Sequence, residues 1–370
     1  MTIALAATFA LSGHRIHVGP LRSRKRNGRS RRVIPAVDRV VEPGRGWLQT
    51  AMPAPRFAQR SGPCSRCEPD LPLRATMKIL TPFCLLLALA SSAATAATPT
   101  TSFYAVGHQD DWQLFMNPNA FNDVRETTAR TVIVHTTAGD AGVGTGNAGR
   151  SQPYYLAREE GALRALRFMK SAYRDVGQQQ LQRTVPTING HPIVRYASTD
   201  GRAVMYFLRL PDGGVGGSQS IALLKTAGTP VSAIDGSTTY STWANFTATL
   251  AALVRAEASG SIDVWFNLAD TDATLNPGDH TDHVYTSQAM QEARAALSTC
   301  INQALYVEYD TKNRPDNVGG NNLLTKVATW GATNSGIADM DHANSFDNDH
   351  NPWLTRTYYR VLNGTGDCAL

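Results

Sequence analysis

The chain has 370 residues, of which 42% are hydrophobic and 18% charged, with a formal net charge of +5. Residues 1–76 hold 14 of the 35 Lys and Arg but only 4 of the 30 Asp and Glu, and Lys78 is a further base. Residues 97–370 therefore carry 20 bases and 26 acids, a net charge of about −6 that argues against nucleic acid as a partner.

The N-terminal region contains the pattern of a secretory signal. Residues 77–96 place one Lys before an apolar stretch and a run of small residues with an Ala-x-Ala pattern, a segment too short to span a bilayer. We expect cleavage near Ala96 and export to the periplasm or the medium. Because a signal peptide begins a chain, residues 1–76 are predicted to be a mis-assigned upstream extension without ordered structure. A basic arm that binds nucleic acid or a membrane is the alternative, which the signal behind it disfavours.

The cysteines divide at the same boundary. Cys64 and Cys67 have the spacing of half a zinc site, but no second pair follows. Cys300 and Cys368 remain after processing, either as one disulfide or as two free thiols, and export favours the disulfide.

Extended and helical patterns alternate through residues 97–370, which we expect to form a single domain with a C-terminal extension from about residue 310. The predicted strands are 102–106, 130–137, 191–198, 203–210, 262–268 and 303–309, and the predicted helices are 154–174, 239–258 and 287–297. This alternation predicts an α/β fold, a Rossmann-like three-layer sandwich with a mostly parallel sheet. Ligands of such sheets bind outside the carboxyl ends of the strands.

Two short clusters of His and Asp follow predicted strands. They are His108, Asp110 and Asp111 in GHQDDW, and His280, Asp282 and His283 in DHTDH. Imidazole and carboxylate ligands suit a divalent cation such as zinc, and three protein ligands with one open position are typical of a catalytic site. Either cluster alone is more often a turn or a helix cap. Two such clusters at predicted carboxyl ends favour a metal site.

In sequence order, GHQDDW, VHTTAGDAG, LAREEGAL and DHTDH resemble the PIG-L/LmbE-like N-acetylglucosaminyl deacetylases, whose hallmarks are AHPDDE and HPDH. The resemblance covers residues from about 102 to about 300. It implies a Rossmann-like fold, one zinc ion, and hydrolysis of N-acetyl groups on glucosamine-containing substrates.

The resemblance also implies roles for individual residues. Its zinc ligands correspond to His108, Asp111 and His283, and its general base to Asp110. In this scheme zinc activates water, Asp110 accepts the proton, and a protonated His280, oriented by Asp282, polarises the carbonyl or protonates the leaving amine. Two interpretations are open for each of two further residues. Arg158 is expected either to bind substrate or to lie on a helix surface, and Asp140 either to contact substrate or to cap the loop that follows it.

The chain departs from the family pattern at four positions. Gln109 and Thr281 replace the prolines of the two hallmarks, Trp112 replaces the terminal Glu of the first, and Gly278 replaces a Tyr that some members carry. Since that Glu is not a metal ligand in the family, its replacement by Trp112 is expected to change the residues around the ligands or the substrate rim.

The C-terminal stretch DMDHANSFDNDH, residues 339–350, repeats Asp-x-Asp-His. Three interpretations are open for this stretch: a second metal site, with calcium bound through the carboxylates, a solvated loop, or a border of the catalytic cleft. The nearby aromatic residues either stack on sugar rings or pack in the core: Trp330, Trp353, Tyr358 and Tyr359.

The sequence therefore predicts an exported, zinc-dependent hydrolase that removes an N-acetyl group from an N-acetylglucosamine-containing substrate. The alternatives are an amidase for another sugar-linked amide and a catalytically silent carbohydrate-binding module. A Rossmann nucleotide-binding protein is disfavoured, because no GxGxxG directly follows the first strand.

Overall fold

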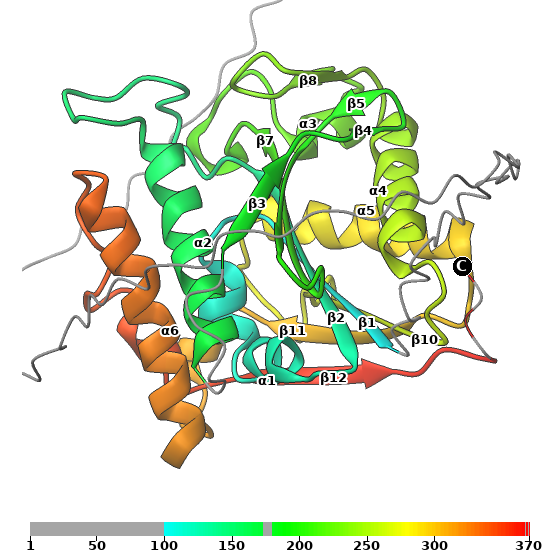
Figure 1. Cartoon of the computed structure of the whole chain (residues 1–370). Coiled ribbons are helices and arrows are strands. Elements are labelled where there is room, and N and C mark those ends of the chain that lie inside the picture. Colours follow the sequence, from blue (N-terminus) through cyan, green and yellow to red (C-terminus); the bar gives the residue numbers. More distant parts are fainter. Residues whose placement is uncertain (1–99, 173–179, 367, 369) are drawn as a thin grey trace, which may run out of the picture. The chain divides into compact units, whose positions relative to one another are not determined.

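A computed structural model describes residues 100–172, 180–366, 368 and 370 (Figure 1). The predicted signal peptide at 77–96, the upstream segment 1–76 and the pair Cys64 and Cys67 lie outside these residues, so they stay predictions.

The centre of the fold is an eight-stranded sheet with the strand order β12-β11-β10-β1-β2-β7-β6-β3. Strands β11, β10, β1, β2 and β7 are parallel, whereas β12 and β6 run antiparallel to their neighbours β11 and β7. The eight strands are β1 (Thr100–Val106), β2 (Ala129–Thr137), β3 (Leu181–Thr184), β6 (Val194–Ser198), β7 (Ala203–Leu210), β10 (Asp263–Ala269), β11 (Asn302–Val307) and β12 (Tyr358–Leu362). Two small hairpins pair β4 (Thr187–Ile188) with β5 (His191–Pro192) and β8 (Val231–Ser232) with β9 (Thr239–Tyr240).

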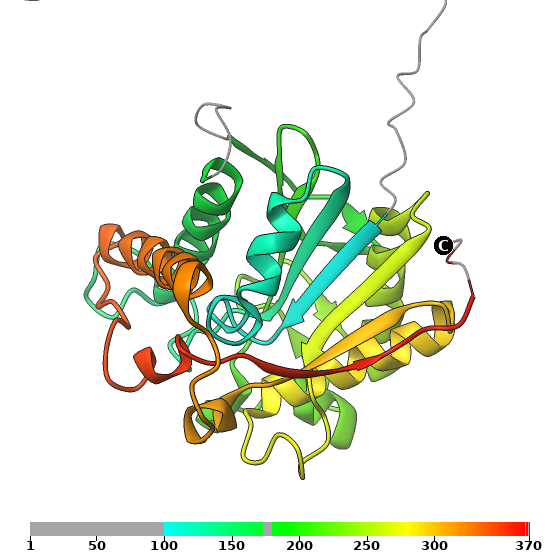
Figure 2. The same ribbon diagram turned by 90° about the horizontal axis from the view of Figure 1, so that it is seen from below.

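Helices cover both faces of the sheet, and Figure 2 shows α2 and α6 side by side on one face with α5 on the other. The first face carries α1 (Asn119–Arg125), α2 (Tyr154–Ser171), α6 (Gly320–Asp339) and the short helix η1 (Trp112–Met116), and the second carries α3 (Ile221–Thr226), α4 (Trp243–Ala258) and α5 (Thr281–Leu297). Short helical turns are η2 (Gly213–Val215), η3 (Tyr309–Asn313) and η4 (Asn351–Trp353).

The core follows the alternation of side chains along buried strands. Phe103 packs with the cluster on the α4 and α5 face, and its neighbour Tyr104 packs with the cluster on the α2 and α6 face. The predicted α/β architecture, three layers around a mostly parallel sheet, is confirmed. Residues beyond about 310 supply α6 and the edge strand β12.

Two predicted elements differ from the structure for local reasons. The predicted strand 191–198 is divided into β5, which pairs with β4, and β6, which pairs with β7. The predicted helix 239–258 begins only after Thr242, whose side-chain oxygen accepts a hydrogen bond from the Asn245 amide at 3.1 Å as an N-cap.

A disulfide joins Cys300 and Cys368, with Cα atoms 5.2 Å apart, and confirms the predicted pairing. It ties the C-terminal residues to the turn before β11.

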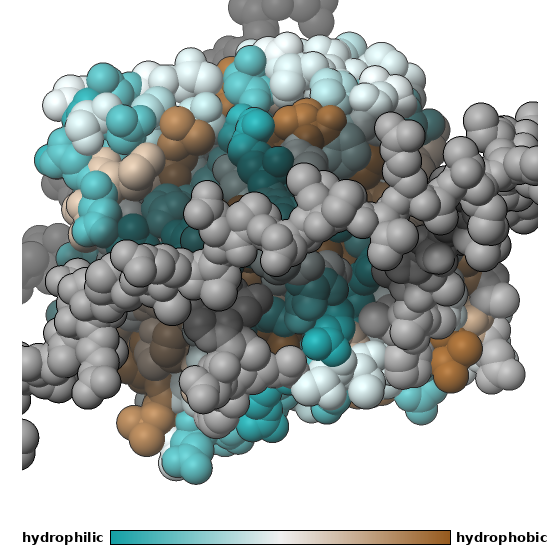
Figure 3. All heavy atoms as spheres, in the orientation of Figure 1, coloured by the Kyte–Doolittle hydropathy of each residue, from teal (hydrophilic) through white to brown (hydrophobic). Residues whose placement is uncertain are grey.

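Figure 3 shows hydrophilic and hydrophobic residues intermixed on the coloured part of the face seen in Figure 1. Among the described residues, no helix combines the length and the apolar character needed to cross a membrane.

Candidate active site

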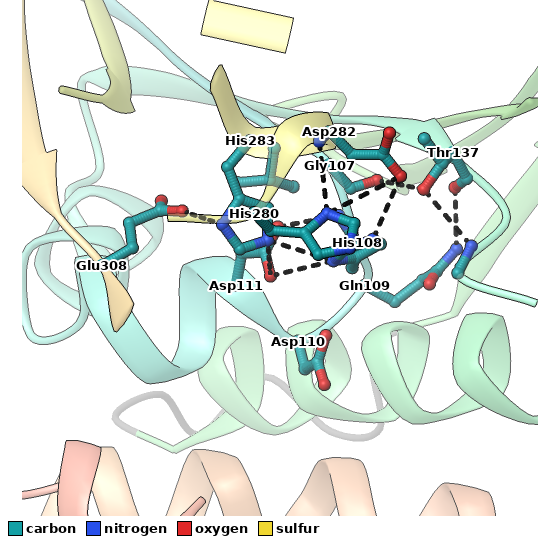
Figure 4. Close-up of polar contacts among 12 residues, drawn as sticks. Gly107, His108, Gln109, Asp110, Asp111, Thr137, His280, Asp282, His283 and Glu308 are labelled. Atoms are coloured by element: carbon teal, nitrogen blue, oxygen red, sulfur yellow. Dashed lines mark hydrogen bonds and ion pairs between the residues drawn. The ribbon is translucent and has the colours of Figure 1, made fainter. Parts of the chain in front are cut away.

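The two predicted His/Asp clusters meet at the carboxyl edge of the sheet, because β1 and β10 are neighbouring parallel strands (Figure 4). His108 Nδ1 lies 3.0 Å from His283 Nε2. Asp111 Oδ1 lies 3.2 Å from His283 Nε2 and 3.7 Å from His108 Nδ1. The three predicted metal ligands therefore present their donor atoms to one point.

The local sequence explains this approach. A Cβ atom on Gly107 would lie 2.9 Å from Cδ2 of His283, so a glycine at this position lets the start of α5 reach the end of β1. The backbone amide of His108 donates to Asp111 Oδ2 at 2.7 Å, which closes the turn and directs Oδ1 toward the imidazoles.

Carboxylates lie behind both imidazoles. His283 Nδ1 is 2.9 Å from Asp279 Oδ1 and 2.6 Å from Glu308 Oε2, and His108 Nε2 is 3.3 Å from Asp282 Oδ2. A metal-binding His commonly donates its outer N–H to a carboxylate, which fixes the ring and its tautomer. The other nitrogen of each ring, Nδ1 of His108 and Nε2 of His283, is thus the one available to a metal ion.

The electrostatics of the cluster favour positive charge. Burial acts to lower the pKa of His108, but Asp111 and Asp282 outweigh it and raise that pKa to about 9. Burial is likewise outweighed at His283, whose pKa is raised well above its ordinary value by Asp111, Glu308 and Asp279. The carboxylates around the two rings therefore stabilise positive charge at this point.

The donor set fits a divalent cation. Ligand atoms about 2.0–2.1 Å from a tetrahedral ion lie roughly 3.3 Å from one another, and the three observed separations are 3.0, 3.2 and 3.7 Å. Two imidazole nitrogens facing each other at 3.0 Å also need a shared proton or an ion between them. His108, Asp111 and His283 therefore form a candidate metal centre.

His280 stands at the N-terminus of α5 as its N-cap. Its Nδ1 accepts a hydrogen bond from the Asp282 amide at 3.2 Å, which leaves Nε2 as the N–H-bearing atom, 3.8 Å from Asp212 Oδ1. Burial, together with the neighbouring His108 and His283, lowers the pKa of His280. Both observations favour the neutral imidazole over the predicted imidazolium.

Asp282 holds His280 differently from expectation. Its backbone amide bonds the imidazole, whereas its carboxylate Oδ2 is 3.9 Å from His280 Nδ1 and accepts from the Gly213 amide at 2.9 Å. The same Oδ2 is closer to His108 Nε2, at 3.3 Å. Asp282 therefore orients His280 through the helix terminus and orients a metal ligand through its carboxylate.

Asp110 is paired with Arg158 of α2. The two side chains form an ion pair, and Arg158 Nη1 also donates to the Gly139 carbonyl at 3.0 Å. Figure 4 shows Asp110 apart from the imidazole cluster and beside α2. Burial acts to lower the pKa of Arg158, but Asp110 outweighs it and raises that pKa. Arg158 is thus placed in the site, not on the outer surface of the helix.

The contacts of Asp140 and Trp112 indicate structural roles for both residues. Asp140 is buried and accepts hydrogen bonds from the Asp212 amide at 2.9 Å and the Gly144 amide at 2.7 Å, the arrangement of a loop cap. Trp112 is fully buried and donates Nε1–H to His135 Nε2 at 3.2 Å. Trp112 therefore packs in the core and does not form a substrate rim.

A cavity of about 210 Å³ opens beside the candidate metal centre. Its polar lining residues include His108, Asp110, Asp111, Arg158, Asp212 and His280. The lining also includes Phe115, Tyr309, Ser345, His350 and Trp353. The C-terminal loop thus borders the cavity, in agreement with one of its three predicted alternatives.

Three acidic residues of that C-terminal stretch form ion pairs or hydrogen bonds within the protein. Asp339 pairs with Arg164, Asp341 Oδ2 accepts from the Ser151 amide at 3.1 Å, and Asp347 Oδ1 accepts from the His350 amide at 3.0 Å. The first two contacts join this stretch to residues 164 and 151, and the third closes a turn. Within the described residues, its Asp and His side chains form no group that could hold a second ion.

Sequence reasoning missed the supporting residues of the site. These are Asp212, Asp279, Glu308 and Tyr309. Glu308 directly follows β11, the neighbour of β10. Its position at the carboxyl end of a strand is the feature by which it could have been predicted.

No family model matches the chain, and no curated protein matches it. Among solved structures it is similar to an N,N'-diacetylchitobiose deacetylase from Pyrococcus horikoshii in complex with its inhibitor, at 14% identity and a TM-score of 0.40, over 73% of this chain and 85% of that one. It is also similar to GalB, the 4-carboxy-2-hydroxymuconate hydratase from Pseudomonas putida KT2440, at 12% identity and a TM-score of 0.35, over 69% and 81%. Likenesses this weak decide neither family nor activity.

The chain's own sheet and side chains define an α/β protein with a candidate metal-binding cluster at the carboxyl edge of its sheet.

Proposed function

We propose that the protein is an exported, zinc-dependent hydrolase that removes an N-acetyl group from an N-acetylglucosamine-containing substrate, as a member of the PIG-L/LmbE-like deacetylases. The observation that carries this proposal is the convergence of His108, Asp111 and His283 beside a cavity that Asp110 and His280 also line. A single cavity thus holds metal ligands, a carboxylate outside the ligand set and an N–H donor, the parts that amide hydrolysis needs.

In the proposed reaction these residues have separate roles. A bound divalent cation supplies a Lewis acid that activates water and polarises a carbonyl oxygen. Asp110, fixed by its ion pair with Arg158, is the group placed to accept the proton from the attacking water. His280 lines the cavity with Nε2 3.8 Å from Asp212 Oδ1, and in this scheme its Nε2–H stabilises the negative charge that develops on the amide oxygen.

The neutral state of His280 has a consequence for the leaving group. A neutral imidazole is a poor proton donor to an amine, whereas the carboxyl group of Asp110 has just received a proton in this scheme. Asp110 therefore serves first as base and then as acid, and His280 acts as a hydrogen-bond donor.

Export and the choice of sugar rest on other observations. The signal pattern at 77–96 and the disulfide between Cys300 and Cys368 both suit an oxidising compartment. The N-acetylglucosamine moiety comes from the resemblance of GHQDDW and DHTDH to the family hallmarks. A silent binding module would need neither Asp110 nor the N–H donor of His280.

Acetate release tests the proposal. The purified protein is incubated with N-acetylglucosamine conjugates, chitooligosaccharides and other sugar-linked amides, before chelation, after chelation and after zinc is restored. We expect release that is lost on chelation and returns with zinc. Absence of release from every acetamide despite stoichiometric bound metal would contradict deacetylation, and release of a different acid would identify the amidase. Mass spectrometry of the exported protein checks cleavage near Ala96.

A further inference from the structure

Part of the cavity lining comes from the segment 345–353, which lies outside the two His/Asp motifs. Ser345, His350 and Trp353 line the cavity from this segment. None of them belongs to the two His/Asp motifs, and they follow α6 in the chain. The part of a substrate that extends beyond the amide would meet this segment.

Each lining residue is anchored to the body of the protein. The Ser345 amide donates to Asn334 Oδ1 of α6 at 2.6 Å. Trp353 donates Nε1–H to the Tyr309 carbonyl at 3.2 Å and stacks on the Tyr309 ring, with centroids 5.3 Å apart. Groups held by such contacts are preorganised for binding, because little side-chain freedom is lost when a ligand arrives.

His350 is held most closely. Its Nδ1 lies 2.7 Å from Asp347 Oδ1, and that oxygen also accepts from the backbone amides of Asp349 and His350 at 3.0 Å each. The ring lies nearly parallel to Trp330, at 24° with centroids 5.8 Å apart. The carboxylate thus fixes both the direction of the imidazole and the position of its proton on Nδ1.

The other ring nitrogen of His350 is then a hydrogen-bond acceptor. Among the described residues no hydrogen bond to His350 Nε2 is found, and the residue lines the cavity. An acceptor fixed at a cavity wall recognises a hydroxyl or N–H donor on a ligand. A sugar ring carries several hydroxyl groups at a distance from its acetamide, whereas a simple acetamide carries none.

We propose that His350, oriented by Asp347, is a specificity-determining residue that accepts a hydrogen bond from a hydroxyl group of the substrate beyond its amide. This inference rests on the proposed function, since it names the part of an amino-sugar substrate that the wall recognises. The residue contributes to the choice of substrate and not to the chemistry at the amide.

The test compares two acetamides across three proteins. The substrates are an N-acetylglucosamine conjugate and an acetanilide, which has no hydroxyl groups. The proteins are the wild type, His350→Ala and His342→Ala. His342 is a matched control, because this histidine of the same C-terminal region contacts the Gln152 carbonyl through Nε2 at 2.7 Å and does not line the cavity.

We expect His350→Ala to lower kcat/KM for the sugar roughly tenfold through KM, the usual scale of one lost hydrogen bond. Its kcat/KM for the acetanilide should equal that of the wild type, and His342→Ala should resemble the wild type on both. Asp347→Asn should give a smaller loss in the same direction, because the carboxylate acts only through His350. Deoxy analogues of the sugar should lose affinity for the wild type, and one of them should show no further loss with His350→Ala.

The outcomes separate this inference from the proposed function. If the wild type turns over the sugar conjugate and His350→Ala has the same KM for it, the inference is wrong and the proposed deacetylase activity is unaffected. Equal losses on both substrates would show a structural effect and overturn it as well. Should the wild type turn over neither substrate, calorimetric binding of the sugar conjugate to the zinc-loaded wild type and His350→Ala still decides, since equal affinities would overturn the inference.

Discussion

Helices α2 and α6 cross at two glycines, Gly161 and Gly336, and both helices position residues that line the cavity. A Cβ atom on Gly336 would lie 2.7 Å from the Gly161 Cα, 2.8 Å from its nitrogen and 2.9 Å from the Glu160 carbonyl oxygen. All three are backbone atoms, so the clash is relieved only by moving one helix. Because α2 carries Arg158 and α6 carries Asn334, which holds Ser345, such a movement would alter the cavity.

Gly336→Ala should therefore destabilise the protein by about 1–3 kcal/mol, the cost of overpacking a close interface. For a chain of this size that corresponds to a melting temperature lower by roughly 2–10 °C. Gly331→Ala is the matched control on the same helix, since a Cβ atom there meets no atom within 4 Å. This control should gain up to about 1 kcal/mol, because alanine favours a helix interior over glycine.

Thermal unfolding of the two variants and the wild type measures the difference, and turnover of the sugar substrate reports on the cavity. Equal melting temperatures for Gly336→Ala and Gly331→Ala would refute the close helix approach. A destabilised Gly336→Ala with unchanged kinetic constants would show that the α2–α6 contact does not shape the cavity.

Three further predictions concern separate parts of the molecule. Asp110→Ala should lower kcat at least 100-fold while bound zinc, measured by atomic absorption, stays stoichiometric; metal loss would instead make Asp110 a ligand. Lys326 is buried, and burial lowers its pKa to about 7. Above pH 7 the Lys326 amine keeps its proton in the unfolded chain and has lost it in the folded chain. The free energy of unfolding, relative to that of Lys326→Met, should therefore rise by about 1.4 kcal/mol per pH unit up to about pH 10 in chemical denaturation. A difference that does not change with pH would contradict the lowered pKa of this buried amine. Replacing Cys300 and Cys368 by Ser opens a disulfide with a sequence separation of 68 residues and should cost about 4 kcal/mol in the same assay; unchanged stability would contradict a structural role.

The sheet and the metal ligands could be predicted because both follow from strands. Val132 and Val134 mark a buried strand by their apolar neighbours, and parallel strands bring their carboxyl ends together whatever the intervening sequence. Placing His108 and His283 on one side of the molecule needed only that β1 and β10 be parallel. Because β1 and β10 are also neighbours in the sheet, the side chains of His108 and His283 lie close together.

Residues that act through tertiary contacts could not be predicted. Trp112 follows the first motif directly, but its burial depends on His135 of β2, which accepts its indole N–H. The pairing of Asp110 with Arg158 depends on where α2 lies over the sheet. Neither partner is marked by spacing along the chain, because the contacts join segments that the fold brings together.

The role of His280 depends on where α5 begins. The apolar pattern predicts a helix from residue 287, which would leave DHTDH in a loop, whereas α5 starts at Thr281 with His280 as its N-cap. His280→Ala would therefore remove an N-cap as well as the Nε2 donor, and the lost cap alone costs about 1 kcal/mol. His280→Asn keeps a capping oxygen but has no imidazole. If Nε2–H stabilises the developing oxyanion, both variants should lose a similar factor in kcat, roughly 100-fold or more, while His280→Asn keeps the wild-type melting temperature. A His280→Asn variant with near wild-type kcat would show that the histidine serves the helix and not the reaction.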